Sequence, residues 1–451
     1  MPIELWLLII LFVFVFAYFL LTKRPIYEAM FLGFLLMLAL TGSWKSAGSF
    51  FWGACTDSLV YAIIAFVALS KLLSVTGVID GCISLILAIF GRLTGGAGYV
   101  AVIASTFMGA LSGSGPGNVM ATGVITIPAM KSSGFPPHLA AGVAASASTM
   151  GNMIPPSGII VATFGCYAAF CPDSGVNVGK FWLILWAIAV YFIVQRIVTL
   201  YAFCKYYKVA PMKKEELPSI RETFKKSWKS LLLPVIILAP FLIDSQCGDF
   251  FTARLGAAGA KSFSSCLLLF IAGVAAIYTL LIAPDKSKIR PAALAKAFTS
   301  SLRSMVPTVV TVIFSYAISN LFNATGISAA LTDFIGGFGL SAVAIAFLIP
   351  LLTAFLGMIF PGSTQIAMFG TMLITVMAAA GIDPLLAAAM LPAICGAMSG
   401  ITPPVAVCTF AAMGIAESDY KKTVQNSLVW VALHYILSVL LLLGILPVLG
   451  I

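Results

Sequence analysis

Charged residues are scarce in this chain: they make up 9% of its 451 residues, whereas hydrophobic residues make up 61%. Soluble domains carry about a quarter charged residues, so this shortage excludes a soluble protein and indicates an integral membrane protein. The net charge of +10 does not predict nucleic-acid binding, because Lys and Arg gather between the hydrophobic runs, as they do in cytoplasmic loops.

Clustered cysteines and a signal-peptide cleavage site are also missing. The nine cysteines form no Cys-x-x-Cys pair and no group with histidine, which argues against a zinc site or a disulfide framework. Cys171 and Cys247 both fall in expected outer loops, and a bond between them stays open. Residues 3–21 are long enough to span a membrane, and no cleavage site follows before Lys23 and Arg24, so we expect no separate signal peptide.

Hydrophobic runs divide the chain into two halves joined by a basic linker at 204–230. In the first half, residues 1–203, we expect scaffold spans within 1–73 (4–22, 26–42 and 52–73), a short arm at 81–91, a reentrant hairpin at 93–130, a broken helix at 138–171 and a span at 181–203. In the second half, residues 231–451, we expect scaffold spans within 231–323 (231–243, 262–283 and 304–323), an arm at 328–338, a hairpin at 341–380, a broken helix at 385–416 and a span at 424–448.

Landmarks of the first half return in the second at separations of 245 to 249 residues. The matching pairs are Gly77 with Gly326, Pro116 with Pro361, Gly134 with Gly381, and Pro155 with Pro403. Four pairs in the same order indicate an internal repeat. Each half has five full crossings, an odd number, so the halves must have opposite topology. The predicted fold is an all-α membrane protein with two inverted repeats, each with a reentrant hairpin and a broken helix.

The basic residues agree with this topology, because all the main groups fall on one side. These groups are Lys23 with Arg24, Lys71, Arg92, Lys131, the linker, the 286–290 segment and Lys421 with Lys422. The positive-inside rule makes that side cytoplasmic and places both termini outside, in the periplasm if this is a bacterial inner membrane. The first hairpin then enters from the cytoplasm, and the second, flanked by Asp333 and Asp383, enters from outside.

Four interruptions lie within the apolar segments, at 112–118, 151–157, 360–365 and 399–404. A helix that stops inside a membrane leaves carbonyls and N–H groups without partners, so its ends can bind a cation or an anion. We expect Pro116 and Pro156 in the first turns of the restarting helices. The substrate is predicted to contact polar side chains at the breaks: Ser114, Asn118, Asn152, Ser157, Ser363, Thr364 and Thr402.

Acidic residues are missing where the chain is interrupted. None of the fifteen Asp and Glu residues lies in 93–165 or 334–382, or near Thr402. Because a proton relay normally uses an intramembrane carboxylate, Na+ held by carbonyls and hydroxyls is the favoured coupling ion.

Simpler explanations exist for single residues. A glycine in a membrane helix more often serves close helix packing than a binding site. The Gly-rich run at 112–118 lacks the Lys-Ser/Thr of a phosphate loop. Lys131 and His138 are interpreted as interfacial, and His434 as a packed or hydrogen-bonded side chain.

The runs Gly109–Met130, Ala144–Ser157, Leu233–Ile237, Gly381–Pro384 and Gly400–Val405 resemble the large membrane subunit, the M or DctM type, of tripartite ATP-independent periplasmic (TRAP) transporters. The resemblance covers nearly the whole chain. It implies a carrier, not an enzyme, that imports organic acid anions with Na+ by an elevator motion. A small four-helix membrane subunit (Q type) and a periplasmic binding protein (P type) are the implied partners, besides membrane lipid.

The resemblance also implies one Na+ site at each hairpin tip with its facing break. The first comprises Ser112, Gly113, Gly115, Gly151 and Ile154, and the second Gly357, Gly362, Ser399 and Thr402. Two segments depart from the family pattern: the loop 248–256 lacks the usual Pro and Glu, and Pro116-Gly117 replaces the common Ala-Asp.

Two alternatives stay open. A stand-alone dicarboxylate carrier or Na+/H+ antiporter of the ion transporter superfamily would need no binding protein. A channel or a purely structural membrane subunit would leave two symmetric reentrant breaks without a use.

The topology can be tested by labelling single cysteines at Ser132 and Gly381 in a background without native cysteines. Because basic residues flank only the first hairpin, we expect an impermeant maleimide added outside to label position 381 and to spare position 132. The reverse pattern would invert the predicted orientation.

Overall fold

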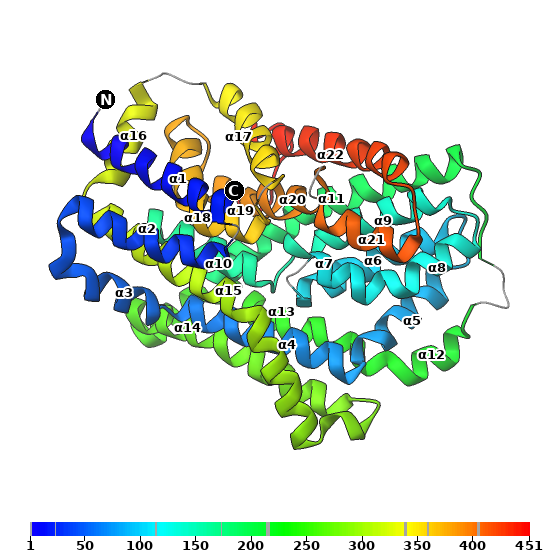
Figure 1. Ribbon diagram of the computed structural model, residues 1–451. Helices are drawn as coiled ribbons and strands as arrows, with labels where there is room; N and C mark the ends of the chain where they lie inside the picture. The colour runs from blue at the N-terminus through cyan, green and yellow to red at the C-terminus, as the bar shows by residue number, and fades with distance from the viewer. Residues whose placement is uncertain are drawn as a thin grey trace.

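Long helices run in one general direction through the molecule in a computed structural model (Figure 1), which describes residues 2–22, 24–112, 115–172, 174–212, 217–337, 341–358, 360–403 and 406–451. Every regular element in these ranges is a helix. Six of the described helices are long and apolar enough to cross a membrane, or seven if one bent pair counts as a single span. The remaining apolar helices are shorter, because the hairpins and broken helices divide them into pieces.

The first half contains these elements in order: α1 (Ile3–Thr22), α2 (Ile26–Thr41), α3 (Ala47–Cys55), α4 (Ser58–Thr76), α5 (Val78–Phe90), α6 (Gly96–Ser112), α7 (Gly115–Asn118), the π-helix η2 (Val119–Gly123), α8 (Val124–Ser132), α9 (Pro137–Thr149), η3 (Met150–Asn152), α10 (Gly158–Phe170) and α11 (Val178–Tyr206). The hairpin is α6 to α8, and the broken helix is α9, η3 and α10.

The linker and second half contain α12 (Ile220–Ser227), α13 (Leu232–Gln246), α14 (Gly248–Ile282), α15 (Pro291–Ala324), α16 (Ile327–Gly337), α17 (Ala342–Gly357), α18 (Gly362–Ala379), α19 (Pro384–Leu391), the π-helix η7 (Pro392–Ala397), α20 (Met398–Ile401), α21 (Val407–Ala416) and α22 (Tyr420–Leu442). Here α17 and α18 form the hairpin, and α19 to α21 form the broken helix.

The backbone repeats the landmarks that the sequence repeats. Gly77 and Gly326, which precede the two arms, have φ values of 70° and 77°. Gly134 and Gly381, which follow the two hairpins, have φ values of 92° and 89°. These values lie in the left-handed region that glycine enters without steric cost. The same chain reversals are therefore built with the same residue in both halves.

Several predicted boundaries are wrong. The span expected at 52–73 is two helices, α3 and α4, bent by 41°, and the Asp57 carboxylate accepts a hydrogen bond from the Leu59 N–H at the start of α4. The helix expected at 304–323 begins earlier, at Pro291, whereas α14 is kinked at Gly256 and its apolar part begins at Ala258. The last span ends at Leu442, not at residue 448. Hydrophobicity marks only the apolar part of a helix, whereas backbone hydrogen bonds continue through polar turns.

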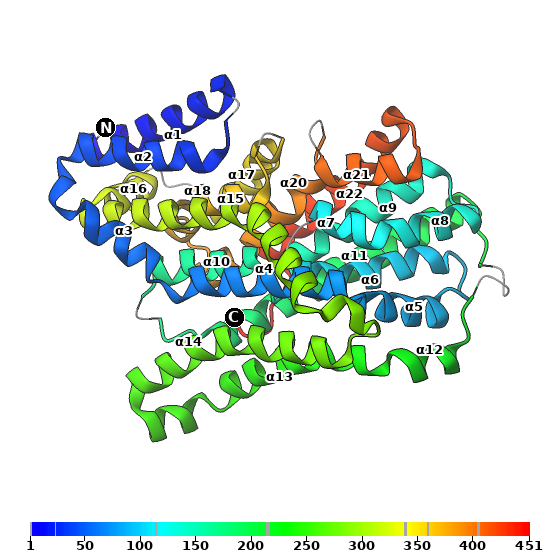
Figure 2. The same cartoon turned by 60° about the horizontal axis from the view of Figure 1, so that its bottom comes forward.

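The second broken helix lies at the centre of the protein and α14 at its edge. Within residues 384–401, 89% of the residues are buried, whereas in an apolar 18-residue part of 258–282 only 24% are buried. Figure 2 shows α12, α13 and α14 along one edge, while α7, α9, α20 and α21 lie together, away from that edge, in both views. The interruptions therefore sit where protein, not lipid, surrounds the backbone.

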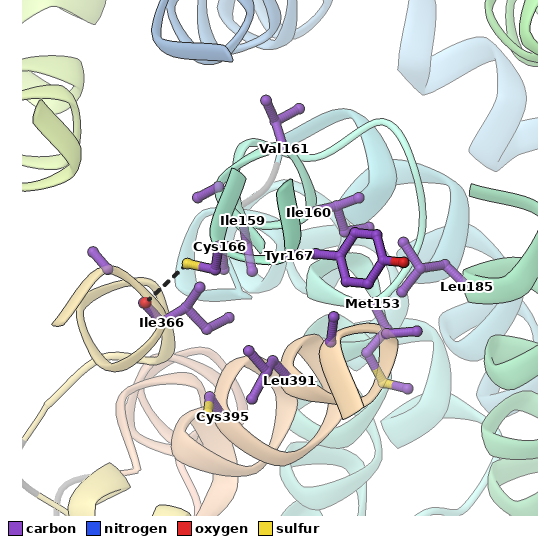
Figure 3. Close-up of a cluster of buried hydrophobic side chains, with 14 of the residues drawn as sticks. Met153, Ile159, Ile160, Val161, Cys166, Tyr167, Leu185, Ile366, Leu391 and Cys395 are labelled. Carbon is purple, nitrogen blue, oxygen red and sulfur yellow. Dashed lines mark hydrogen bonds between the residues drawn. The ribbon is translucent and has the colours of Figure 1, made fainter. Parts of the chain in front are cut away.

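Apolar side chains join the two repeats beside the breaks. Figure 3 shows residues of α10, including Cys166, packed against Ile366 of α18 and Leu391 of α19. The Cys166 thiol donates to the Ile366 carbonyl over 3.7 Å. Gly370 leaves room for this contact, because a Cβ there would lie 2.6 Å from the Cys166 sulfur. Cys171 and Cys247 are both free thiols, so the disulfide left open by the sequence is not formed.

Candidate functional site

Each hairpin crosses its own broken helix backbone to backbone. In the first repeat Gly109 of α6 touches Gly151 of η3, and a Cβ on either glycine would collide with the backbone of the other. In the second repeat a Cβ on Gly357 would lie 2.9 Å from the Ser399 Cα. These pairs are equivalent in the two repeats, since 248 residues separate Gly109 from Gly357 and Gly151 from Ser399. The close crossings bring each hairpin tip to the facing break.

The two breaks also touch each other across the repeats. The side-chain amide of Asn152 donates from Nδ2 to the Gly396 carbonyl over 2.7 Å. The methyl group of Thr149, the last residue of α9, lies 2.7 Å from the position that a Cβ on Gly400 would occupy. The same methyl lies 3.9 Å from the position of a Cβ on Gly115 at the first hairpin tip. Both breaks and the first tip thus share one small region.

Three buried amide side chains at this region have their nitrogen atoms occupied and their oxygen atoms unpartnered. Asn118 donates from Nδ2 to the Ser105 carbonyl at 2.7 Å and to the Ser148 carbonyl at 3.0 Å. The side chain of Gln365 donates from Nε2 to the Phe360 carbonyl at 3.2 Å. Because a carbonyl can only accept, these contacts fix which end of each amide is nitrogen.

The oxygens left over are Asn118 Oδ1, Asn152 Oδ1 and Gln365 Oε1. All three are buried and have no hydrogen-bond partner among the described residues. A buried acceptor without a partner is costly, so such an oxygen is suited to receive a ligand. An amide oxygen can coordinate a hard cation or accept a hydrogen bond from a substrate hydroxyl. Gln365 belongs to the interrupted segment 360–365 but was not predicted as a site residue.

The other predicted residues divide into three groups. Gly113, Ser114 and the side chain of Ser112 lie outside the described residues. The hydroxyls of Thr402 and Ser399 donate to helix carbonyls, Met398 O at 2.7 Å and Gly396 O at 3.4 Å, and keep their acceptor lone pairs. Thr364 and Ile154 are buried, Ser363 is half-buried, and Gly362 packs against Gly396.

Two sequence predictions about the restarting helices have different outcomes. Pro116 lies in the first turn of α7, as expected. Pro156 does not lie in a first turn, because α10 begins only at Gly158. The Ser157 hydroxyl instead caps α10 by accepting from the Ile160 N–H at 3.4 Å. Serine is a strong N-cap residue, so it sets the helix start two residues after the proline.

The two π-helical turns beside the breaks were not predicted. The turn η2 directly follows the first hairpin tip, and η7 directly precedes the second break. A π-helical turn adds a residue to an α-helix and frequently occurs at functional sites. Pro392 at the start of η7 lacks an N–H and is the sequence signal that could have revealed it.

Arg196 is a charged residue near the breaks that the sequence patterns did not reveal. It lies in α11 with 1% of its surface exposed. Its Nε donates to the Ser146 carbonyl at 3.1 Å, and its Nη2 lies 3.4 Å from Thr149 Oγ1 and 3.3 Å from His434 Nδ1. His434 in turn lies 3.1 Å, through Nε2, from the Ala393 carbonyl of η7. The interpretation of His434 as a hydrogen-bonded side chain is confirmed.

Lys131 and His138 lie at the end of the first hairpin and the start of α9. The exposed Lys131 donates from Nζ to the Ala416 carbonyl at 3.1 Å, so it caps the last turn of α21. His138 Nε2 lies 3.3 Å from the Tyr207 hydroxyl. These contacts tie helix ends together, and the interfacial role of both residues stays a prediction.

The fold and site define a class before any comparison: two inverted repeats with reentrant hairpins and buried, symmetric helix breaks form a secondary carrier. The family model of the tripartite ATP-independent periplasmic transporter, DctM component, matches residues 12–449. The chain therefore belongs to the family of TRAP transporter large permeases.

Curated relatives agree with this assignment. The C4-dicarboxylate TRAP transporter large permease protein DctM of Vibrio cholerae is 26% identical over 394 residues, which cover 84% of this chain and 82% of the relative. The 2,3-diketo-L-gulonate TRAP transporter large permease protein YiaN of Escherichia coli is 29% identical over 208 residues, covering 46% of each. The sialic acid TRAP transporter large permease protein SiaM of Vibrio cholerae is 24% identical, covering 86% and 84%.

Two transporters of known structure share the fold at low sequence identity. The YdaH transporter of Alcanivorax borkumensis superposes with a TM-score of 0.64 at 16% identity, covering 90% of this chain and 88% of that one. MtrF of Neisseria gonorrhoeae superposes with a TM-score of 0.64 at 15% identity, covering 91% and 84%. At these identities the likeness shows a common architecture.

The backbone crossing predicts a strong effect of one methyl group. Gly109→Ala places a Cβ against the backbone of Gly151, which cannot move without opening the break. We expect a loss of about 1–3 kcal/mol in stability from overpacking, seen as a lower melting temperature of the purified protein, together with loss of transport.

Gly414→Ala is the matched control, because a Cβ on Gly414 meets nothing within 4 Å and the residue is also helical. The helix-propensity gain is the same in both variants, so it cancels. Equal melting temperatures for the two variants would contradict the tight crossing.

Proposed function

We propose that this permease imports small organic acid anions and that Na+ drives the transport. The single observation that carries the proposal is the set of buried, unpartnered amide oxygens at the hairpin tips and helix breaks. They are neutral oxygen ligands in a region without Asp or Glu in 93–165 and 334–382. Neutral oxygens can hold a cation without a proton exchange, whereas a proton relay normally needs a titratable group there.

The substrate class is supported by the relatives and by the geometry together. The names of the relatives include a C4-dicarboxylate, a diketo-gulonate and sialic acid as substrates, and all three carry a carboxylate group. In this chain helices restart at Gly115, Gly158, Gly362 and Val407, beside the breaks. The N-terminus of a helix attracts an anion through its free N–H groups.

Membership of the TRAP family supports two partners over a stand-alone carrier: a small four-helix membrane subunit and a periplasmic binding protein. A surface for the small subunit is available on α14, where an apolar stripe at helical spacing is exposed: Phe270, Val274, Ile277 and Leu281. We propose that this stripe, with the neighbouring scaffold spans, packs against the small subunit, because α14 is the least buried of the candidate spans.

Sodium coupling is tested with Thr402→Ala in proteoliposomes that contain this chain, the small subunit and the binding protein. Succinate is the probe, since a dicarboxylate is the substrate named for one relative. The loss of one oxygen ligand costs about 1–3 kcal/mol, so we expect the half-saturating Na+ concentration to rise about fivefold or more.

Thr375→Ala is the matched control. Both threonines are buried and both donate to the carbonyl four residues earlier, but Thr375 lies in the C-terminal half of α18, away from the breaks. Its removal should leave the Na+ dependence unchanged. Uptake that follows a proton gradient without Na+ would refute Na+ as the coupling ion. Vigorous uptake by the chain alone would favour a stand-alone carrier.

We further propose an elevator motion in which the hairpins and broken helices move against the scaffold on the arms α5 and α16. The bridge through Arg196 and His434 ties α11 to α9 and α22 to η7 by buried hydrogen bonds. We therefore place α11 and α22 in the moving unit.

A small cavity between the proposed units gives a site for cross-linking. It is lined by Phe107 of the first hairpin and by Pro234, Ile237 and Leu238 of α13. We expect Phe107→Cys to cross-link with Ile237→Cys in one state and with positions one or two turns along α13 in another, in a background without native cysteines. Each link should stop transport, because the unit could no longer slide. A single partner position, with uptake unchanged after linking, would contradict the motion.

A further inference from the structure

Arg196 carries a charge that nothing nearby neutralises. It is buried in an apolar span, and no carboxylate among the described residues lies within ion-pair distance of it. A charged side chain in the middle of a membrane costs at least about 2.5–3.5 kcal/mol, so buried arginines normally pair with an acid or serve transport. The following inference rests on the proposed function and concerns what this charge does there.

The guanidinium donates only to neutral acceptors among the described residues. These are the carbonyls of Ser146 and Phe192, the side chains of Gln195 and Thr149, and His434 Nδ1, at 3.1 to 3.5 Å. Neutral acceptors satisfy the N–H groups and fix the orientation of the fork, but they leave the positive charge in place. In a medium of low dielectric such a charge acts over a longer distance than in water.

His434 is neutral and accepts a hydrogen bond from the Arg196 guanidinium. Arginine only donates, so His434 Nδ1 is the acceptor, and its proton is therefore on Nε2, which donates to the Ala393 carbonyl. His434 also stacks on Phe192, with ring centroids 4.2 Å apart. The imidazole is thus locked in one tautomer and one orientation, and it contributes no charge of its own.

Thr149 separates the guanidinium from the site. Its hydroxyl lies 3.4 Å from Arg196 Nη2, whereas its methyl group packs towards Gly400 of the second break and Gly115 of the first hairpin tip. Arg196 therefore stands one side chain behind the place where both breaks meet. It cannot contact a bound anion directly without displacing Thr149, but its field reaches the breaks.

We propose that Arg196, oriented by His434, is a positioning residue whose unneutralised charge strengthens the binding of the anionic substrate and weakens the binding of Na+ at the breaks. The charge sets the balance between the two ligands. With no acidic residue in the two hairpins, it gives the region a net positive potential that favours the anion, and the cation binds best when the anion is also present.

The test removes the charge in two ways and measures both ligands. Arg196→Gln keeps some hydrogen bonds, and Arg196→Met is an apolar replacement that a buried site commonly tolerates. Succinate uptake is measured in proteoliposomes with the whole complex, and radioactive Na+ binding without succinate is measured on the purified membrane complex. A unit charge about 10 Å away at an effective dielectric constant of about 20 changes binding by about tenfold.

We expect opposite shifts in the two assays. The KM for succinate should rise about tenfold, and the Na+ concentration for half-maximal binding should fall by a similar factor. Arg196→Lys should restore both values towards wild type, because it keeps the charge. His434→Gln keeps the charge but loosens its position, so it should shift both values in the same directions as the neutral variants do, by a smaller factor.

Lys422→Gln is the matched control: it removes one positive charge from an exposed position on α22, the helix that carries His434. It should change neither the KM for succinate nor the Na+ concentration for half-maximal binding. If both ligands bind more weakly in the neutral variants, or only the maximal rate falls, Arg196 is a structural residue and the proposal is wrong.

Failure of the proposed function would look different. Wild-type uptake driven by protons would refute Na+ coupling. The KM for succinate in the Arg196 variants would still decide whether the charge strengthens anion binding. If wild type does not transport succinate, the Na+ binding arm still decides, because a lower half-saturating Na+ concentration in both neutral variants supports the role of the charge and an unchanged one overturns it.

Discussion

Backbone groups at an interrupted helix have no water to bind inside a membrane, and this constraint shapes the whole protein. The interruptions can exist only where other parts of the chain surround them. The structure meets this requirement by crossing each hairpin over its own broken helix at Gly109 and Gly357. Because the crossings are backbone against backbone, the two breaks lie deep in the molecule, and less buried spans such as α14 lie outside them.

The same close packing prepares the site for ligands. Side-chain nitrogens of Asn118, Asn152 and Gln365 bind backbone carbonyls near the breaks, and this leaves their oxygens buried and unpartnered. The amides therefore do two things at once: they hold the interrupted backbone in place, and they present acceptors of fixed direction. In the proposed mechanism, these neutral acceptors and one buried guanidinium hold a cation and an anion without an acidic group.

Each half contributes to the region in its own way, although the fold repeats. Glycines with positive φ recur at Gly77 and Gly326 and at Gly134 and Gly381, because the chain reversals are the same. The side chains differ: Gly151 of the first break is matched by Ser399 in the second. A repeated backbone therefore carries two unlike linings.

The sequence by itself determined the membrane class, the inverted repeat, the four interruptions and the lack of acids around them, because hydrophobicity, spacing and composition are local properties of the chain. Only the tertiary structure decided which amide oxygens stay free, where helices such as α14 and α15 begin, and that Pro156 lies outside α10. The bridge between Arg196 and His434 joins residues 238 positions apart. No periodic pattern marks such a pair, since it depends on how α11 and α22 pack around the breaks.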